Sequence, residues 1–169
     1  SLIYSGHKPI EIQFACELGF GQGLTLNFND NCSEASWFGT DFNTSQAFFA
    51  RDLNKSFESG AQIYDQDFDT FCSRTDLPQF DFIALHGVWS WVSEQNRKVI
   101  IEFIKQKLSP GGAVYVGYNV RAGWAAFHPI RNLMEHLVGS SDTTSTSVDL
   151  NSKIKNSIRP VQDLFESIP

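Results

Sequence analysis

Cysteine is scarce in this sequence. The three cysteines, Cys16, Cys32 and Cys72, are widely spaced, form no Cys-x-x-Cys pair and have no cluster of histidines beside them. This spacing excludes a disulfide framework and a zinc site, and it is typical of reduced thiols in the cytoplasm. We therefore expect a cytoplasmic protein without a metal site.

Long hydrophobic runs and an excess of basic residues are also lacking. No stretch reaches the roughly 18 apolar residues of a membrane-spanning helix, and the N-terminus lacks the basic start and apolar core of a secretory signal. The formal net charge of −6 gives no general attraction to a phosphate backbone. The sequence thus predicts a protein that binds neither membranes nor nucleic acids.

What is present is the composition of a folded domain. The chain has 169 residues, of which 41% are hydrophobic and 19% are charged. This length supports one hydrophobic core of ordinary size rather than two, and the hydrophobic share excludes an intrinsically disordered chain.

Short apolar segments alternate with longer amphipathic ones over the first two thirds of the chain. This alternation is typical of βαβ units that build a parallel sheet. It predicts strands at residues 12–18, 35–40, 61–64, 80–85 and 113–118. It predicts helices at residues 23–31, 44–59, 69–74 and 93–108. The expected fold class is therefore α/β.

The helix at residues 93–108 has the clearest boundaries. Ser93 is a suitable N-cap, and Pro110-Gly111-Gly112 is expected to end the helix and turn the chain into the fifth strand. The basic residues of this helix, Arg97 and Lys98 among them, are expected on its solvated face.

The end of the chain is less regular. Residues 139–147 are rich in serine and threonine without periodicity, which predicts a linker, and a weaker helix is expected over residues 150–167, broken at Pro160. We therefore divide the chain into a core at residues 1–138 and a linker with a helical tail at residues 139–169.

The most informative segment is the glycine-rich turn after the first strand, residues 17–23, with the sequence Glu-Leu-Gly-Phe-Gly-Gln-Gly. Alternate glycines allow the backbone to pass close to a ligand at the carboxyl end of a parallel strand, where open α/β sheets bind nucleotides. The dinucleotide pattern G-x-G-x-x-G requires a glycine where this chain has Leu24. This departure counts against NAD.

Two carboxylates accompany this turn. Glu17, at the end of the first strand, would repel a pyrophosphate but suits a ligand that carries positive charge. Asp41, 24 positions later at the end of the second strand, lies near the spacing of roughly 20 residues at which an acid accepts the ribose hydroxyls. Together the two acids indicate an adenosine with a cationic appendage and no phosphate.

These motifs resemble those of class I S-adenosylmethionine-dependent methyltransferases. Residues 17–23 look like the first motif of that family, Gly39-Thr40-Asp41 like its ribose-binding acid, and residues 108–117 like its closing helix-PGG-strand segment. Residues 83–92, 115–119 and 123–124 resemble bacterial members whose methyltransferase core precedes a methyltransferase regulatory domain. The resemblance covers roughly residues 10–138. It implies a doubly wound, mainly parallel Rossmann-like sheet in the order 3-2-1-4-5, with S-adenosylmethionine as the cofactor.

Carried over residue by residue, the resemblance implies a cofactor site and a substrate site. The residues assigned to the cofactor are Glu17, Gly19, Phe20 and Gly21 for methionine, Asp41 and Phe42 for ribose, Asp67 and Phe68 for adenine, and His86 and Gly87 near the sulfonium. The aromatic residues considered for a substrate pocket are Trp89, Trp91 and Tyr118. Such a pocket would lower the pKa of an accepting lysine amine by desolvation, although both tryptophans also suit simple packing. No catalytic residue is identified.

Two elements of the family's usual core are not evident in the sequence: a helix before the first strand and an antiparallel strand pair after the fifth. We therefore keep several functions open. The first is a methyltransferase, with a protein lysine as the favoured acceptor. The second is a cofactor-binding module without turnover, completed by a companion domain or by a second copy at the uncovered sheet edge. The third is a nucleotide-dependent Rossmann oxidoreductase, against which Leu24 and Glu17 count.

Overall fold

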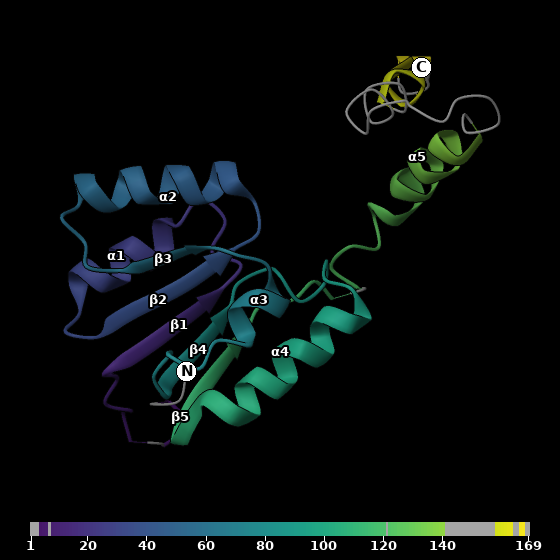
Figure 1. Ribbon diagram of the computed structural model, residues 1–169. Coiled ribbons are helices and arrows are strands. Elements are labelled where there is room, and N and C mark those ends of the chain that lie inside the picture. Colours follow the sequence, from purple (N-terminus) through teal and green to yellow (C-terminus); the bar gives the residue numbers. More distant parts are fainter. Residues whose placement is uncertain (1–3, 7, 121, 141–157, 164–165, 168–169) are drawn as a thin grey trace. The chain divides into compact units, whose positions relative to one another are not determined.

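The computed structural model describes residues 4–6, 8–120, 122–140, 158–163 and 166–167 (Figure 1). The chain divides into two compact units, residues 1–118 and residues 119–169. Across the described part of the chain, no helix has both the length and the apolar character needed to cross a bilayer.

A parallel sheet of five strands forms the centre of the first unit (Figure 1). The strands are β1 (Phe14–Leu18), β2 (Ser36–Asp41), β3 (Gln62–Asp65), β4 (Phe80–Leu85) and β5 (Leu108–Val116). They lie in the order β3-β2-β1-β4-β5, and every neighbouring pair is parallel. The predicted α/β fold class and strand order are therefore confirmed.

Helices cover both faces of this sheet, because parallel strands need long crossover connections, which are usually helical. They are α1 (Leu24–Cys32), α2 (Thr44–Ser56), α3 (Phe68–Cys72) and α4 (Glu94–Lys107). In Figure 1, α1 and α2 lie on one side of the sheet, and α3 and α4 lie on the other. The two crossovers that precede β2 and β3 thus run over one face, and those that precede β4 and β5 run over the opposite face.

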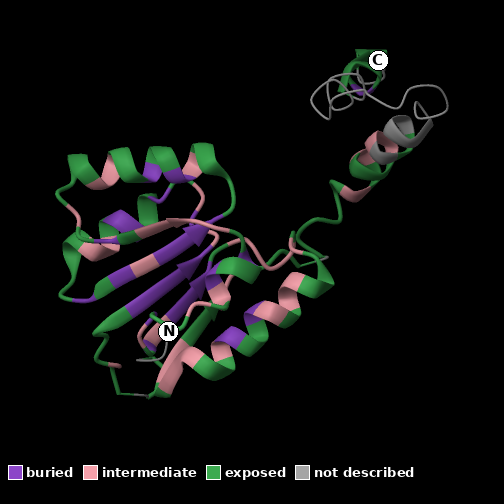
Figure 2. Cartoon of the chain, in the orientation of Figure 1, coloured by how far each residue is buried: buried purple, intermediate pink, exposed green. Residues whose placement is uncertain are grey.

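The two faces carry separate hydrophobic cores. The face under α3 and α4 is built from large side chains, and the Phe103 ring lies 5.8 Å from the Phe71 ring and 6.0 Å from the Phe80 ring, measured between centroids. The face under α1 and α2 is built largely from alanines, and Trp37 is the largest of its buried residues. Small side chains let α1 and α2 pack close to the sheet. Figure 2 shows the central strands β1, β2 and β4 as mostly buried, whereas the outer strands β3 and β5 are partly exposed.

The fifth strand begins earlier than predicted. β5 starts at Leu108, directly after α4, so Pro110-Gly111-Gly112 lies inside the strand instead of before it. The pairing with β4 is irregular here, because Leu108 pairs with Phe80 while Ala113 pairs with Phe82. Gly111 has a φ of +84°, and the position of a β-carbon on Gly112 would lie 2.9 Å from the carbonyl oxygen of Asp81. The glycines therefore form a bulge in an edge strand, where a proline is tolerated.

The second unit contains a helix that the sequence analysis did not predict, α5 (His128–Ser140). Its first turn includes Pro129, which a helix accepts at its start. The predicted linker therefore cannot begin at residue 139, and the rest of that linker lies outside the described residues. Residues 158–163 are helical through Pro160, so the predicted break at this proline is wrong.

Candidate functional site

Polar residues from several strands meet at one edge of the sheet. Glu17 and Asp41 are at the carboxyl ends of β1 and β2, while Asp67 and His86 follow β3 and β4. Because these strands are parallel and adjacent, their carboxyl ends lie along the same edge, the arrowhead end of the strands in Figure 1. Open α/β sheets bind their ligands at this edge. The topology thus brings together the residues that the sequence analysis singled out for a cofactor.

The glycine-rich turn after β1 adopts a left-handed backbone. Gly19, Gly21 and Gly23 have φ angles of +75°, +57° and +71°. A β-carbon on Gly19 would lie 2.5 Å from Val88 Cγ2, and one on Gly23 would lie 2.5 Å from the β-carbon of Ala50. A β-carbon on Gly21 would meet no atom within 4 Å. Gly19 and Gly23 are therefore required for packing, whereas the space over Gly21 is open to a ligand.

Phe20 differs from its glycine neighbours because its side chain does not face this open space. It is 6% exposed and belongs to the core under α1 and α2, beside Gly39. Its backbone N–H and that of Gly19 both donate to the carbonyl oxygen of Thr40, over 3.4 and 2.8 Å. The Phe20 side chain thus anchors the turn to the sheet, and only its main chain lies at the predicted cofactor site.

Asp41 fastens the turn to the end of β2. Its carboxylate is 8% exposed; one oxygen, Oδ2, accepts a hydrogen bond from the backbone N–H of Gly21, and Oδ1 accepts one from Asn43, both over 2.9 Å. Each carboxylate oxygen can accept a further hydrogen bond, so the group can still receive the hydroxyls of a ribose. The next residue, Phe42, is 75% exposed and presents an apolar ring beside that position.

Glu17 is buried just as deeply but has no such partners. It is 2% exposed, and its Oε2 atom has no hydrogen-bond partner among the described residues. It pairs in register with Gly39 on one side and Ala84 on the other, and neither neighbour offers a polar side chain. Burial raises the pKa of the Glu17 carboxyl group from 4.5 to about 7. The end of β1 therefore holds a carboxyl group whose hydrogen bonding is incomplete.

The segment after β3 is held by two polar contacts. The hydroxyl of Thr40 donates to the carbonyl oxygen of Gln66 over 2.6 Å, which ties this segment to β2. Asp67 is the N-cap of α3 and accepts a hydrogen bond from the backbone N–H of Thr70 over 2.8 Å. Hydrogen bonding to Thr70 lowers the pKa of Asp67. Phe68 is 8% exposed and packs into the core under α3 and α4, so its side chain is not free to frame a ligand.

The loop after β4 closes the other side of the edge. His86 is exposed, and its ring meets the ring of Tyr115 edge to face, with 5.9 Å between centroids. Gly87 has a φ of +72° and donates its N–H to the carbonyl oxygen of Gly117 over 3.2 Å. The contact of Val88 with Gly19 brings this loop against the glycine turn. The structure therefore places His86 and Gly87 beside the turn, as predicted for a shared site.

The three aromatic residues predicted for a substrate pocket have different surroundings. Trp89 is half-buried and packs against the core under α3 and α4. Trp91 is 60% exposed, and Tyr118 is 62% exposed. Trp91 and Tyr118 therefore present accessible rings, whereas Trp89 serves mainly in packing.

Arg97 is a residue that the sequence analysis placed wrongly. Its Nε atom donates to the carbonyl oxygen of Trp89 over 3.2 Å, and its guanidinium lies 5.7 Å from the centre of the Trp89 ring. It therefore fastens the loop after β4 to α4 instead of pointing into solvent. Lys98, by contrast, is exposed and pairs with Glu94 one turn away, as predicted. Spacing along the helix could not separate these two neighbouring cations, because the partner of Arg97 is a main-chain atom of a loop.

Val88 was also missed, and no local signal could have found it. Its side chain contacts Gly19, far away in the sequence. An apolar residue after a strand gives no indication of which glycine it will cover.

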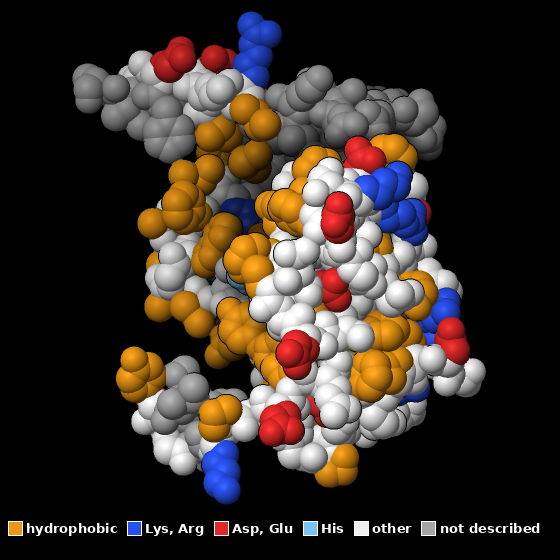
Figure 3. All heavy atoms as spheres, turned by 90° about the vertical axis from the view of Figure 1, so that its left-hand side faces the viewer, with side chains coloured by type: hydrophobic (Ala, Val, Ile, Leu, Met, Phe, Trp, Pro, Cys, Tyr) orange, Lys and Arg blue, Asp and Glu red, His pale blue; other side chains and the backbone are white. Residues whose placement is uncertain are grey.

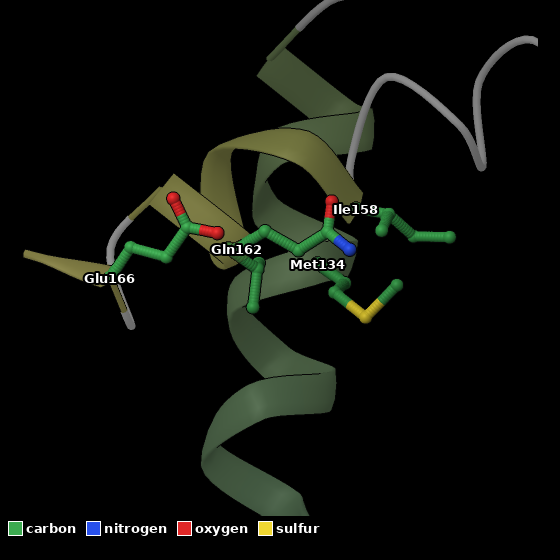
Figure 4. Close-up of a pocket in the computed structure, with 5 residues that line it drawn as sticks. Met134, Ile158, Gln162 and Glu166 are labelled. Atoms are coloured by element: carbon green, nitrogen blue, oxygen red, sulfur yellow. The ribbon is translucent and has the colours of Figure 1, made fainter.

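Other hollows lie away from this edge. Figure 4 shows one of about 250 Å³ within the second unit, where Met134 of α5 and Ile158, Gln162 and Glu166 of the C-terminal segment line it. No residue predicted for the cofactor or the substrate contributes to it. On the face seen in Figure 3, acidic side chains are scattered among polar and hydrophobic ones. The described residues contain no group of three or more His, Cys, Asp and Glu that could hold a metal ion.

No protein-family model matches the chain, but individual proteins are similar to it. Uncharacterized protein sll1526 of Synechocystis is 42% identical over 121 residues, which are 70% of this chain and 24% of that protein. Uncharacterized protein RP028 of Rickettsia prowazekii is 29% identical over 164 residues, which are 94% of this chain and 62% of that protein. The chain thus spans less than two thirds of the length of each.

Solved structures share its fold at low sequence identity. PKMT2 from Rickettsia typhi, in complex with AdoHcy, is 24% identical with a TM-score of 0.68, and the match covers 96% of this chain and 30% of that one. A TehB-like SAM-dependent methyltransferase from Corynebacterium glutamicum is 20% identical with a TM-score of 0.54, covering 76% of this chain and 73% of that one. These likenesses, together with the strand order, show that the chain has the Rossmann-like fold of class I methyltransferases.

Proposed function

We propose that this chain binds S-adenosylmethionine at the carboxyl ends of β1, β2 and β4 and belongs to an enzyme that transfers the methyl group. The observation that carries the proposal is the buried Glu17 carboxyl group with an unpartnered oxygen, directly before a glycine turn with open space over Gly21. A buried carboxyl group without partners is costly, and a cationic ligand is the partner that it lacks.

The residues at this edge fit an adenosine with a positively charged appendage. Asp41 has room to accept the ribose hydroxyls, and the exposed ring of Phe42 offers an apolar surface beside the base. Glu17 and the main chain around Gly21 would hold the amino acid portion. Asp67, already used as a helix cap, would contact the adenine with its exposed carboxylate. The carboxyl groups of Glu17 and Asp41 would repel a pyrophosphate, which weakens the alternative of a nucleotide-dependent oxidoreductase.

When bound, S-adenosylmethionine supplies an electrophilic methyl group, so the protein needs little covalent machinery. The chain's own residues bind and orient the reactants and exclude water. The loop after β4 is suited to this positioning, because Val88 rests on Gly19 and Arg97 fixes Trp89. We assign no catalytic acid or base.

For the acceptor we propose a protein lysine. The sequence resembles bacterial methyltransferases whose core precedes a regulatory domain, and some members of that wider group methylate protein lysines. The similarity to the structure named PKMT2 from Rickettsia typhi also supports this choice. The exposed rings of Trp91 and Tyr118 could cover the stem of a lysine and lower the pKa of its amine by desolvation. The acceptor amine must be neutral to attack a methyl group.

The length of the relatives bears on the whole protein's activity. The chain covers 24% of the protein sll1526, and the resemblance noted from sequence is to methyltransferases that also carry a regulatory domain. We propose that residues outside this chain complete the substrate site, as a further domain or as a second copy. We also propose the cytoplasm as the compartment, which the three free cysteines support.

Calorimetry tests the cofactor proposal directly. The chain is titrated with S-adenosylmethionine and, separately, with S-adenosylhomocysteine. Saturable binding of either ligand is expected, and the absence of binding at millimolar ligand would contradict the proposal. Asp41→Ala should weaken binding by about 1.5 to 3 kcal/mol for each hydrogen bond lost to the ribose. An unchanged affinity would remove Asp41 from the site.

A second function is favoured by one feature of the sheet. Among the described residues, β5 is an edge strand with no partner beyond β4, so this chain could bind the cofactor without forming a substrate site. Incubation with methyl-labelled cofactor and a cell extract separates the two functions. Transfer of label to protein supports the enzyme, whereas cofactor binding without transfer supports the module.

A further inference from the structure

The carboxyl group of Glu17 is unusual among the acids of this chain, because it is buried without a compensating contact. It is 2% exposed, and none of the ion pairs between described residues includes it. Its Oε2 atom lacks any hydrogen-bond partner among those residues. Structural roles for buried acids normally show the opposite pattern, with every oxygen satisfied.

The other ionisable groups around β1 are already engaged or lie elsewhere. On β2, Asp41 accepts hydrogen bonds on both oxygens, and on β4, Asp81 accepts two backbone N–H groups at the opposite end of β1. Asp30 of α1 accepts from Trp37, Ser59 and Gly60. Cys16, the preceding residue, is a buried thiol whose pKa is raised by desolvation, by Cys72 and by Glu17. His86, past the end of β4, is exposed.

None of these groups gives Glu17 a positive partner. Its carboxyl group therefore holds a proton more tightly than a solvated one does, and burial raises its pKa to about 7. Near neutral pH, the ligand-free protein contains both protonated and ionised forms of this side chain. A cation placed beside the carboxylate would favour the ionised form.

We propose that binding of a positively charged ligand beside Glu17 expels one proton from the Glu17 carboxyl group to solvent. This inference rests on the proposed binding of S-adenosylmethionine. The balance is simple: the O–H bond of the neutral carboxyl group breaks, the proton passes to buffer, and the carboxylate pairs with the positive charge of the ligand. No oxidant or second reactant is needed.

The proposal predicts how affinity changes with pH. Only the ionised fraction of Glu17 is competent for a cation, so the apparent dissociation constant is the intrinsic one divided by that fraction. With a pKa of about 7, binding should be about fivefold weaker at pH 6 than at pH 7. The range from pH 5.5 to pH 7 is the informative one, because the α-amino group of the ligand stays protonated there. A neutral nucleoside should show no such dependence.

The experiment counts protons by calorimetry. S-adenosylmethionine is titrated into the chain at pH 6 in two buffers with different ionisation enthalpies, and the difference in observed heat gives the number of protons released. We expect about nine-tenths of a proton per ligand bound, because about that fraction of Glu17 is protonated at pH 6. The same titration with 5′-methylthioadenosine, which lacks both the sulfonium and the amino group, should release almost none.

S-adenosylhomocysteine identifies the charge that Glu17 contacts. This ligand keeps the amino group but has lost the sulfonium. Proton release with both S-adenosyl ligands assigns the contact to the ammonium, and release with S-adenosylmethionine alone assigns it to the sulfonium. Equal release with 5′-methylthioadenosine would overturn the proposal, because no cation would then be responsible.

Two variants test which residue releases the proton when the ligand binds. Glu17→Gln keeps the shape of the side chain but cannot ionise, so it should release no proton and bind with a pH-independent affinity. His86→Gln is the matched control, since His86 directly follows β4 at the same edge of the sheet. Release that persists in His86→Gln supports Glu17 as the source. Release that disappears in His86→Gln and persists in Glu17→Gln would overturn the assignment.

The outcomes also separate this inference from the proposed function. If S-adenosylmethionine binds without proton release and with a flat pH dependence, the cofactor proposal stands and the role of Glu17 is wrong. If no ligand binds at any pH, the proposed function itself fails. The wild-type chain decides both questions, so the test does not depend on the folding of a variant.

Discussion

Glu17 at the end of β1 and Asp41 at the end of β2 are both buried, but they differ in their hydrogen bonding. Asp41 is satisfied on both oxygens by backbone N–H groups, whereas Glu17 has an oxygen without a partner. Burial alone therefore does not set the behaviour of an acid at this edge, because Asp41 has two backbone N–H donors, one from the glycine turn and one from the residue two positions later. Asp41 therefore fixes the backbone of the site in the ligand-free protein, whereas Glu17 keeps an oxygen that a ligand can bind.

Removing the Asp41 carboxylate should have the largest effect on the free energy of unfolding. Asp41→Ala leaves the N–H groups of Gly21 and Asn43 without their acceptor, so we expect a loss of about 3 to 5 kcal/mol from two charge-assisted hydrogen bonds. Urea unfolding at pH 7 measures this loss. A loss below about 1 kcal/mol would mean that water replaces the carboxylate readily, and the contrast with Glu17 would disappear.

Glu17→Gln should raise the free energy of unfolding instead of lowering it, and only above about pH 5. The folded-state pKa of about 7 is raised above the ordinary 4.5, so ionisation costs the folded protein stability as pH rises between these values. The ligand-free variant should therefore be more stable than wild type by about 2 to 3 kcal/mol at pH 8, and equal to it below pH 4.5. Unfolding curves at a series of pH values check this, and parallel curves for the two proteins would contradict it.

The smallest expected effect concerns Asn43, the N-cap of α2, which lies two residues after Asp41. The Asn43 side chain accepts hydrogen bonds from the backbone of Ser45 and Gln46 at the start of α2. Asn43→Ala removes this cap but keeps the main-chain N–H that donates to Asp41, so we expect a loss of about 1 kcal/mol. Affinity for S-adenosylmethionine should remain within twofold. A larger loss of affinity would mean that the cap, and not the Asp41 carboxylate, fixes the turn.

Much of this edge was predictable because its signals are local. Alternate glycines after a strand, an acid at the end of that strand and an acid at the end of the next one depend only on neighbouring residues and on parallel topology. The positive φ angles of Gly19, Gly21 and Gly23 agree with the predicted turn. The strand order was likewise predicted correctly, but from the resemblance to class I methyltransferases and not from the βαβ pattern, which indicated only the α/β class.

The features that were missed depend on contacts between distant parts of the chain. Nothing local indicates that Phe20 turns into the core while its glycine neighbours line the edge, or that Arg97 reaches the main chain at Trp89. The early start of β5 was missed for a related reason. Glycine and proline normally interrupt a strand, but pairing with β4 continues around the bulge.

The contact of Val88 with Gly19 links the two halves of the sheet at the very edge where the ligand is proposed to lie. Residue 19 follows β1 and residue 88 follows β4, so their shapes are not independent. A side chain at position 19 would meet two obstacles, the left-handed backbone with its φ of +75° and the Val88 side chain, and a smaller residue at position 88 would remove only the second. In evolutionary terms, position 19 is expected to stay glycine even where a smaller residue occupies position 88.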